Sequence, residues 1–437
     1  MLREGPPVPA EQAQPEVKKK NVIQRMGRGK RILLSSALVS AAFVGGTGYY
    51  AKSHPEETSD FLRATIGNKN RLMVEGWVFK IEDKGKQWRY ELFGGKENPY
   101  GNTFTQVSNT LPPDLVTPTV EAPLPPNPLD YVPPSVILPE MPKPKLATPE
   151  VHLLQSPAEG EGKWIVNDLP YANPDDPLMV KTYVRPDKDR PYASLAVLLL
   201  DKTKMKLNLV GGTEQPGRGP GRIPESDLKN LIVAFNGGFQ NPDGYFGMFA
   251  QGTMYMPLRN GIASVVVMAD GSIKMGAWGE GDLAVKTDDM VAIRQNCALL
   301  VKGGEVTPEA ENKGSNNDIW GYIDKSSSAF ITWRSAIGVT KDGNLIVAIG
   351  NDLSAKTLAY GMQAAGAETA MQLDINSPHS TLITYAMGAD GTLIPKFIRD
   401  KMGDRDLGRF YKTQARDFMY ITLADKSGAS PILAGAR

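Results

Sequence analysis

One continuous stretch decides the fold of this chain: residues 335–374, which read SAIGVTKDGNLIVAIGNDLSAKTLAYGMQAAGAETAMQLD. Its first part, residues 335–350, consists of two apolar runs that meet at Asp342-Gly343. An Asp-Gly pair between two apolar runs favours a tight turn between antiparallel strands. This part therefore predicts a β-hairpin.

The second part of the stretch, residues 351–367, is the best helix candidate in the chain. Its apolar residues recur at helical spacing, Asp352 or Ser354 can serve as the N-cap, and Gly366 can end the helix. The remaining residues, 368–374, are a short apolar run that ends on a carboxylate. The order hairpin, helix, strand is therefore expected.

The surrounding sequence repeats the hairpin pattern and adds few helices. Further hairpins are predicted to turn at Asp270-Gly271 and at Asp390-Gly391, and single buried strands are predicted at 193–200, 206–210 and 231–239. Short strands joined by Asp-Gly turns, with one clear helix, are typical of an α+β domain. We expect a mixed, hairpin-rich β-sheet domain with few helices.

The N-terminal region resembles a membrane anchor. Residues 17–31 contain seven basic residues and no acid, and residues 32–50 contain no charged residue. Nineteen residues of helix rise about 28 Å, enough to cross a bilayer core. The basic flank would keep the N-terminus in the cytoplasm and export the rest. The alternative is a long cleaved signal peptide, although the apolar span exceeds a usual signal core.

The sequence predicts five regions and a single-pass membrane protein with its C-terminal domain outside the cytoplasm. They are a cytoplasmic basic tail (1–31), a transmembrane signal-anchor (32–50), a juxtamembrane region (51–110), a Pro-rich linker (111–150) and the globular domain (151–437). Residues 71–83 and 87–95 suggest a small strand pair. The linker has 13 prolines in 40 positions, which favours an extended spacer or, alternatively, a docking strip for an envelope protein.

Composition excludes several classes of function. A net charge of +1 gives no electrostatic footprint for nucleic acid. The single cysteine, Cys297, excludes an internal disulfide and a Cys-based metal site, and its apolar neighbours favour an inert buried thiol over a nucleophile. The Gly-rich run 211–222 lacks the Gly-Lys-Ser/Thr ending of a phosphate loop and reads as an ordinary loop.

Three polar residues interrupt or end apolar strands and are the candidate site residues. Asn236 precedes Gly237 and Gly238, whose missing side chains would let a ligand approach the backbone. Arg334 is a permanent cation in an apolar strand, and its planar guanidinium suits a carboxylate or phosphate. Asp374 ends its strand, a position at which active groups often gather. We expect Arg334 and Asp374 to face each other across one pocket.

Each candidate also has a purely structural interpretation. Asn236 would cap a turn, and Arg334 would form a structural ion pair with Asp374 or Asp352. Asp374 would form an Asx-turn before the next residues. His379, which follows shortly after, would be a polar surface residue. The sequence leaves both interpretations open.

Four segments together resemble the phosphodiester glycosidase family. They are LIVAFNGGF (231–239), GMFAQGTMYMP (247–257), RSAIGVTKDGNLIVAIG (334–350) and TLAYGMQAAGAETAMQLD (357–374), in the family's order. The resemblance covers roughly residues 190–425. It implies a mixed sheet domain that hydrolyses sugar-1-phosphodiesters, with Asn236, Arg334 and Asp374 at the family's site positions.

The chain departs from the family directly after Asp374. A glycine-rich run ending in serine is expected there, whereas this chain has Ile375-Asn376-Ser377-Pro378-His379-Ser380. Glycines would expose amide donors to a substrate, and proline has no N–H to offer. The departure indicates either a different substrate or a lost activity, and His379 could supply a proton donor instead.

The working hypothesis is a membrane-anchored extracytoplasmic glycosidase that acts on an envelope or exopolysaccharide glycan. Asp374 would attack the anomeric carbon or activate a water, Arg334 would hold the phosphate, and His379 or Asp352 would shuttle a proton. Substrate contacts would come from Asn236 and also from Gly237, Gly238, Asp352, Asn376 and Ser380. No cofactor is predicted, although Asp and Asn groups could hold a divalent cation. The alternatives are a non-catalytic glycan-binding protein and an envelope scaffold.

Overall fold

The computed structural model describes residues 55–95, 98–100, 146–311, 320, 330–377, 379–399, 402 and 406–424. The chain divides into two compact units, Met1–Phe61 and Leu62–Arg437. The predicted membrane span 32–50 and nearly all of the Pro-rich linker lie outside the described residues, and the predicted region boundaries stay predictions. Within the described ranges, no helix combines the length and the apolar character that a membrane crossing needs.

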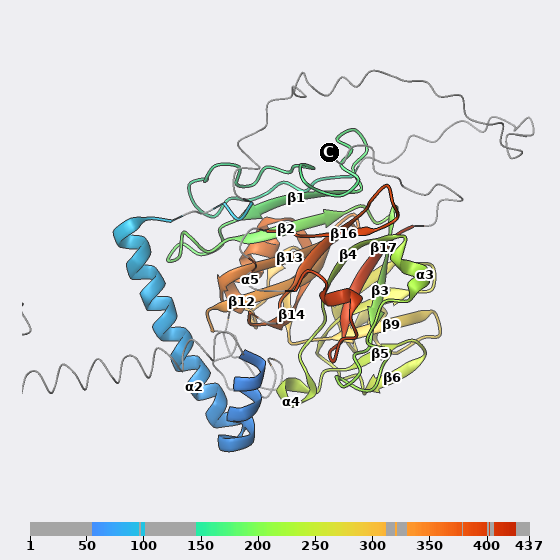
Figure 1. The fold of residues 1–437 in the computed structure, drawn as a ribbon, viewed down its shortest axis with the longest axis horizontal. Coiled ribbons are helices and arrows are strands. Elements are labelled where there is room, and N and C mark those ends of the chain that lie inside the picture. The colour runs from blue at the N-terminus through green and yellow to red at the C-terminus, as the bar shows by residue number, and fades with distance from the viewer. Residues whose placement is uncertain are drawn as a thin grey trace, which may run out of the picture. The chain divides into compact units, whose positions relative to one another are not determined.

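The largest layer is a seven-stranded sheet, drawn in green and orange in Figure 1. Its strands lie in the order β1 (Met179–Val184), β2 (Leu195–Leu200), β13 (Leu345–Leu353), β12 (Thr332–Thr340), β14 (Ala367–Ile375), β10 (Leu299–Lys302) and β11 (Glu305–Val306). The predicted hairpin of residues 335–350 is confirmed as β12 and β13. Asp374 lies at the end of β14, near the middle of this sheet.

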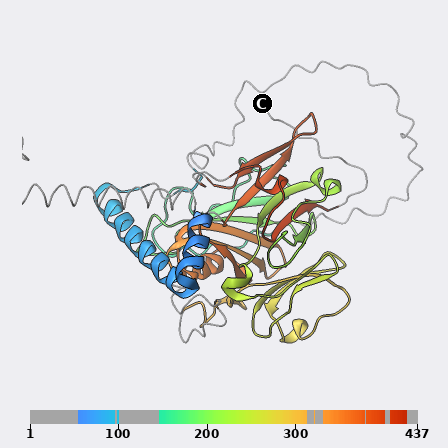
Figure 2. The ribbon, with the colours of Figure 1, turned by 60° about the horizontal axis from the view of Figure 1, so that its bottom comes forward.

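Two five-stranded sheets complete the β structure. One has the order β16 (Leu393–Phe397), β15 (Leu382–Met387), β4 (Leu231–Asn236), β17 (Phe418–Leu423) and β3 (Met205–Val210). The other has the order β6 (Thr253–Met256), β5 (Met248–Ala250), β9 (Met290–Gln295), β7 (Ala263–Met268) and β8 (Ile273–Ala277). In Figure 2 the yellow strands of this last sheet stand apart from the orange strands of the large sheet. The other two predicted hairpins, β7–β8 and β15–β16, are confirmed.

The strand pairing differs from the expected mixed sheet. Every pairing between named strands is antiparallel in the described part of the chain. The helix α5 connects β13 to β14, but these two strands are not neighbours in the sheet. Instead, β12 lies between these two strands and pairs with both, so that the crossover produces no parallel contact.

Few helices accompany the sheets in the described residues. They are α2 (Pro55–Phe93), α3 (Glu225–Leu228), α4 (Asn241–Gly244) and α5 (Ala355–Ala364), with 3-10 turns at Gly281–Leu283 and Arg409–Tyr411. The predicted helix is confirmed as α5, and Ser354 rather than Asp352 is its N-cap. Ser354 and Thr357 form a reciprocal capping box. Residues 351–353, expected within the helix, instead end β13.

The prediction of a strand pair at 71–83 and 87–95 is wrong, because α2 covers almost all of both segments. The apolar residues Val74, Val78, Ile81, Trp88 and Leu92 recur at intervals of three, four or seven residues, which is a helical period and not an alternating one. The helix is kinked at Gly67, whose φ of 78° and ψ of 161° are not helical.

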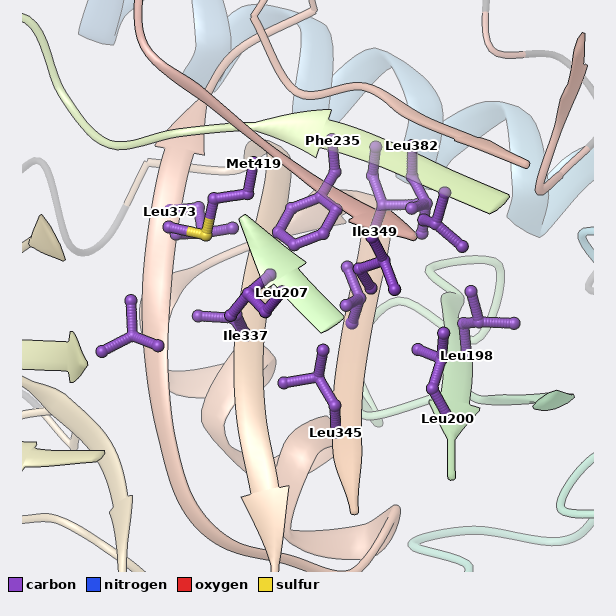
Figure 3. Packing of buried hydrophobic residues seen from close by; sticks show 14 of the residues in the cluster. Leu198, Leu200, Leu207, Phe235, Ile337, Leu345, Ile349, Leu373, Leu382 and Met419 are labelled. Atoms are coloured by element: carbon purple, nitrogen blue, oxygen red, sulfur yellow. The ribbon is translucent and has the colours of Figure 1, made fainter. Parts of the chain in front are cut away.

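The main core lies between the large sheet and the sheet that contains β4 and β17 (Figure 3). Side chains along each strand alternate between the two faces of the large sheet. On β2, Leu198 and Leu200 enter this core, whereas Val197 and Leu199 pack on the opposite face, where α5 covers the sheet. Both faces of the large sheet are therefore buried, which explains its nearly continuous apolar strands.

Core packing next to Asp374 can be tested at Leu373, which is fully buried in the main core. We expect Leu373→Ala to lower the free energy of unfolding by about 2–5 kcal/mol, because it leaves a cavity between two sheets. Urea denaturation measures this change. Ile394→Ala is the control, since Ile394 is 45% exposed, and it should cost less than about 1 kcal/mol. Equal losses for the two variants would contradict the assigned core.

Candidate active site

Asp374 lies at the end of β14, and its carboxylate pairs with Arg416. Arg416 Nη1 donates to Asp374 Oδ2 over 2.8 Å, and the N–H of Ile375 donates to Oδ1 over 2.9 Å. The Asp374 side chain is 9% exposed and that of Arg416 is 19% exposed. The expectation that Arg334 would face Asp374 is therefore wrong, since Arg416, from the residues just before β17, takes this place.

The surroundings of Asp374 bring the pKa of its carboxyl group close to neutral pH. Burial raises the pKa of Asp374 to about 7, against the opposing effect of Arg416 and of the Ile375 N–H. Two further carboxylates, Asp243 and Asp417, act in the same direction as burial. A carboxyl group with a pKa near 7 can exchange a proton at physiological pH.

Asp243, in the short helix α4, is held by two arginines from α2. Arg71 Nη2 donates to Asp243 Oδ1 over 3.1 Å, and Arg63 Nη2 donates to the same oxygen over 3.4 Å. Gln240 Nε2 donates to the other oxygen over 2.9 Å. Both carboxylate oxygens of Asp243 are therefore engaged, and its side chain, 13% exposed, is slightly more accessible than that of Asp374.

A buried ion pair beneath this site joins β9 to the start of β17. Arg294 and Asp417 are both almost fully buried, with Nε donating to Oδ2 over 2.8 Å and Nη2 to Oδ1 over 3.1 Å. Arg294 also donates to three backbone carbonyl oxygens, those of Phe239, Phe246 and Gln295. All donors of Arg294 are therefore engaged, and the pair is a structural anchor.

The two glycines after Asn236 make room for this anchor. The N–H of Gly238 donates to Asp417 Oδ2 over 3.1 Å. A Cβ on Gly237 would lie 1.9 Å from Asp417 Oδ2, and one on Gly238 would lie 2.7 Å from Arg294 Cζ. The packing of the ion pair therefore explains why glycine occupies both positions. The predicted role of these glycines in admitting a substrate stays a prediction.

Asn236, at the end of β4, links three segments of the site. Its Nδ2 donates to Ser335 Oγ over 2.9 Å and to the Gly237 carbonyl over 3.0 Å, while its Oδ1 accepts from the N–H of Thr381 over 2.9 Å. Ser335 Oγ in turn donates to the carbonyl of Asp374 over 2.9 Å. Asn236 is thus linked to the Asp374 backbone through the Ser335 hydroxyl, and this link helps to hold the backbone in place.

Arg334 is fully buried on the α5 side of the large sheet. Its Nε donates to the Leu353 carbonyl and its Nη2 to the Phe330 carbonyl, each over 2.9 Å, and its Nη1 donates to Gln372 Oε1. Burial lowers the pKa of Arg334 to about 9. The guanidinium thus has no exposed surface in this structure from which to hold a phosphate.

The turn after Asp374 is organised around Asn376, whose φ of 76° is left-handed. The carbonyl of Asn376 accepts from the N–H groups of His379 and Ser380, and its Oδ1 accepts from Thr332 Oγ1 over 3.0 Å. Ser380 is buried, and its Oγ donates to the Asp374 carbonyl over 3.0 Å. His379 is half-buried, and its carbonyl accepts from Arg409 Nη1 over 3.3 Å.

Asp352 belongs to a different part of the surface. Its Oδ1 accepts from Lys86 Nζ of α2 over 2.6 Å, and its φ is 62°. Nearby, Asp83 of α2 pairs with Arg190 over 2.5 Å. Asp352 thus takes part in the contact between α2 and the sheet domain, and its proposed role as a proton carrier has no geometric support here.

The Gly-rich loop 211–222, which looked ordinary in the sequence, borders Arg416. The N–H of Gln215 donates to the Ala415 carbonyl over 2.9 Å, and Gln215 forms an isolated parallel bridge with Arg416. A Cβ on Gly212 would lie 2.3 Å from the Ala415 carbonyl oxygen. The glycines thus let this loop pack directly against the segment that carries Arg416.

The described residues contain no group of three or more His, Cys, Asp or Glu side chains arranged to hold a metal ion. Cys297 is fully buried, and burial raises the pKa of its thiol to about 12. A protonated, enclosed thiol is unreactive. These observations favour the inert interpretation of Cys297 over a nucleophile.

Comparison with known families agrees with the resemblance noted in the sequence. Residues 229–374 match the phosphodiester glycosidase family. This part of the chain is a phosphodiester glycosidase domain. The match starts just before β4 and ends at Asp374, so it includes the Asn-Gly-Gly turn, Arg294 and Arg334. Members of this family are hydrolases, and the domain is of a hydrolase type. No curated protein sequence matches the chain.

Three solved structures resemble the phosphodiester glycosidase domain distantly. The catalytic domain of zebrafish N-acetylglucosamine-1-phosphodiester alpha-N-acetylglucosaminidase, auto-inhibited by its pro-peptide, is 14% identical with a TM-score of 0.37, covering 59% of this chain and 87% of its own. A hypothetical protein from Synechocystis is 14% identical with a TM-score of 0.29, covering 53% and 59%. A putative exported protein from Burkholderia pseudomallei K96243 is 10% identical with a TM-score of 0.28, covering 53% and 74%.

Sequence reasoning missed four charged residues of the candidate site: Arg294, Asp417, Arg416 and Asp243. For Arg294 a signal existed, because it interrupts the apolar strand β9 just as Arg334 interrupts β12. The pair Arg416-Asp417 precedes the apolar strand β17, as a polar strand flank commonly does. Nothing in the sequence alone links these residues to Asp374, since they lie more than forty positions away.

The role of the buried ion pair can be tested with Gly238→Ala. We expect a loss of about 3 kcal/mol or more in the free energy of unfolding, because the new methyl group would displace the Arg294 guanidinium from Asp417. Gly276→Ala is the control, since a Cβ there meets only Leu283 Cδ1, at 3.4 Å. Chemical denaturation of both variants measures the difference. A Gly238→Ala protein as stable as Gly276→Ala would refute the anchor.

Proposed function

We propose that this domain hydrolyses sugar-1-phosphodiesters of an envelope or exopolysaccharide glycan, with Asp374 and Arg416 as the reacting pair. The observation that carries the proposal is a carboxyl group with a pKa near 7 beside a partly exposed guanidinium, at the last residue of the family match. In this proposal residues 32–50 anchor the protein in a membrane, and the domain lies outside the cytoplasm.

The chemistry of the substrate fits a site with one carboxyl and one arginine. Cleavage of the bond between the anomeric carbon and the phosphate oxygen sends the bonding electrons to the phosphate, which is already a good leaving group. Arg416 offsets the charge that grows on the leaving phosphate. Asp374, as the carboxylate, either attacks the anomeric carbon or takes a proton from the attacking water.

The other predicted residues do not act on the reacting bond in this proposal, apart from His379 and Asn376. Asn236 and Ser380 hold the backbone of Asp374 through hydrogen bonds. Arg334 donates to the carbonyl oxygens of Phe330, just before β12, and Leu353, at the end of β13. It has no role in holding the phosphate in this proposal. His379 stays a predicted proton carrier, and Asn376 a predicted substrate contact.

Substitution of the pair tests the proposal. We expect Asp374→Asn and Arg416→Ala each to lower kcat/KM by about 10²–10⁴-fold, because each removes a group that acts on the reacting bond. The assay follows release of free sugar from sugar-1-phosphodiesters with varied sugars and alcohols. Asp270→Asn, in the exposed turn of the β7–β8 hairpin, should retain full activity. Unchanged turnover in both site variants would rule out the assignment.

The pH dependence of kcat/KM provides an independent test. Because burial raises the pKa of Asp374 to about 7, its carboxyl is largely neutral at pH 5 and largely ionised at pH 9. A nucleophile or base must be ionised, so activity should rise with pH, with a midpoint near 7, and then level off. Arg416→Gln should shift this midpoint to higher pH, since Arg416 favours the ionised form. A midpoint near 4 in the wild-type protein would contradict the argument.

A second candidate function is glycan binding without turnover. The near-complete burial of Asp374 and the Ile375-Asn376 turn, in place of glycines, favour it. This alternative predicts that the wild-type protein retains glycan fragments but releases no sugar from any phosphodiester. An envelope scaffold is the third candidate. Deleting residues 111–150 would then abolish its role while leaving sugar release, where present, intact.

A further inference from the structure

Helix α2 presents two opposite faces, and only one of them contacts the sheet domain. On the contacting face, Asp83 pairs with Arg190, Lys86 with Asp352, and the ring of Phe79 lies 5.7 Å from that of Phe330. The opposite face carries large apolar side chains that are well exposed: Val74 (40%), Trp77 (68%), Val78 (48%), Ile81 (69%), Trp88 (66%) and Leu92 (54%). An apolar stripe of this length marks an interaction surface.

The spacing of the stripe is that of a helix that packs against another helix. Positions 74, 78, 81, 85, 88 and 92 follow intervals of four and three residues in alternation, which is the heptad pattern of a coiled-coil seam. All are apolar except Gly85, where a Cβ would meet nothing within 4 Å. The seam thus extends over nearly three heptads of one straight helical segment, on the C-terminal side of the kink at Gly67.

We propose that the stripe is a dimer interface, in which α2 of one copy packs antiparallel against α2 of a second copy. In this arrangement Val74 lies opposite Leu92 of the second copy, Val78 opposite Trp88, and Ile81 opposite Gly85. All three pairs share one midpoint, at Asp83, as a two-fold axis requires. A bulky side chain meets a smaller one in each central layer, so the surface is self-complementary.

The charges beside the seam favour the antiparallel arrangement. Glu75, whose carboxylate accepts from Arg71 Nη1 of the same helix over 3.1 Å, lies opposite Arg89 of the second copy, and the two-fold axis repeats this attractive pair. At the centre, Glu82 meets its own copy on one flank and Lys84 meets its copy on the other, where water screens both. A parallel pairing would instead place Lys84 beside Arg89 and supply no opposite-charge pair in exchange.

The charged residues beside the stripe also argue that this face of α2 does not bind a membrane surface. Helices that lie on anionic lipid carry a predominantly basic border, whereas this stripe is bordered by Glu75, Glu82 and Glu91 as much as by Lys80, Lys84 and Arg89. The predicted anchor at 32–50 would assist dimerisation. It would confine two copies to one plane and so raise their effective concentration.

Disulfide trapping in the full chain tests the proposal, because its single native cysteine, Cys297, is fully buried. Two differently tagged chains, Ile81→Cys and Gly85→Cys, are co-expressed, and their membranes are mildly oxidised. We expect the mixed dimer to exceed both same-chain dimers clearly. Lys80→Cys with Gly85→Cys is the control, since Lys80 lies about a quarter turn away from the seam, and this pair should form no disulfide-linked dimer.

Each other outcome overturns the inference in a recognisable way. Dominant Ile81→Cys homodimers would show a parallel pair. No disulfide, with Trp fluorescence quenched by bromine-labelled lipids in vesicles, would show a membrane-bound face. No disulfide and no quenching would show that neither covers the stripe.

A second variant measures the strength of the contact without cysteines. Ile81→Asp should weaken self-association of the full chain at least about a hundredfold, because it loses a buried side chain in both copies and adds two charges to the seam. Light scattering in mild detergent gives the mass. Lys80→Asp introduces an acid one residue away and should leave the dimer unchanged. Retained dimers in Ile81→Asp would exclude the seam.

Discussion

The structure of the site depends on the buried ion pair between Arg294 and Asp417. Two charges removed from water are stable only when every donor and acceptor finds a partner, and here the backbone supplies most of them. The chain after β4 must pass so close to the pair that no side chain fits at Gly237 or Gly238. One electrostatic requirement thus fixes the most recognisable sequence feature of the domain.

The same ion pair sets the chemistry of the neighbouring residue. Because Asp417 is fixed to β9, Arg416 is held at the end of β14, where its guanidinium reaches Asp374. Arg416 and the Ile375 N–H lower the pKa of Asp374, while burial and the charges of Asp243 and Asp417 raise it more. The value near 7 therefore results from a balance of several contacts, and a change at the Arg294–Asp417 pair is expected to alter the pairing of Arg416 with Asp374.

The sequence predicted local structure well and long-range pairing poorly. Asp-Gly turns identified the hairpins, and the periodicity of 355–364 identified α5, because both signals lie within a few neighbouring residues. The partner of Asp374 was assigned to Arg334 instead of Arg416, since a strand's side-chain direction depends on its register and bulges. β12 and β14 shift register between Arg334 and Ala336, which one sequence does not reveal. α2 was misjudged because short apolar runs such as residues 77–79 also fit a strand, although the apolar residues of the longer segment follow a helical period.

The missing glycines after Asp374 matter less than a comparison of residue types suggests. A glycine turn would supply amide donors and a left-handed backbone. Here Ile375 still donates its N–H to the Asp374 carboxylate, and Asn376, one of the residues that tolerate this conformation, adopts the left-handed φ. Ser380 then binds the Asp374 carbonyl and closes the turn. The turn therefore retains a carboxylate held by an amide, while the Ile375 side chain is buried in the core on the α5 side of the large sheet.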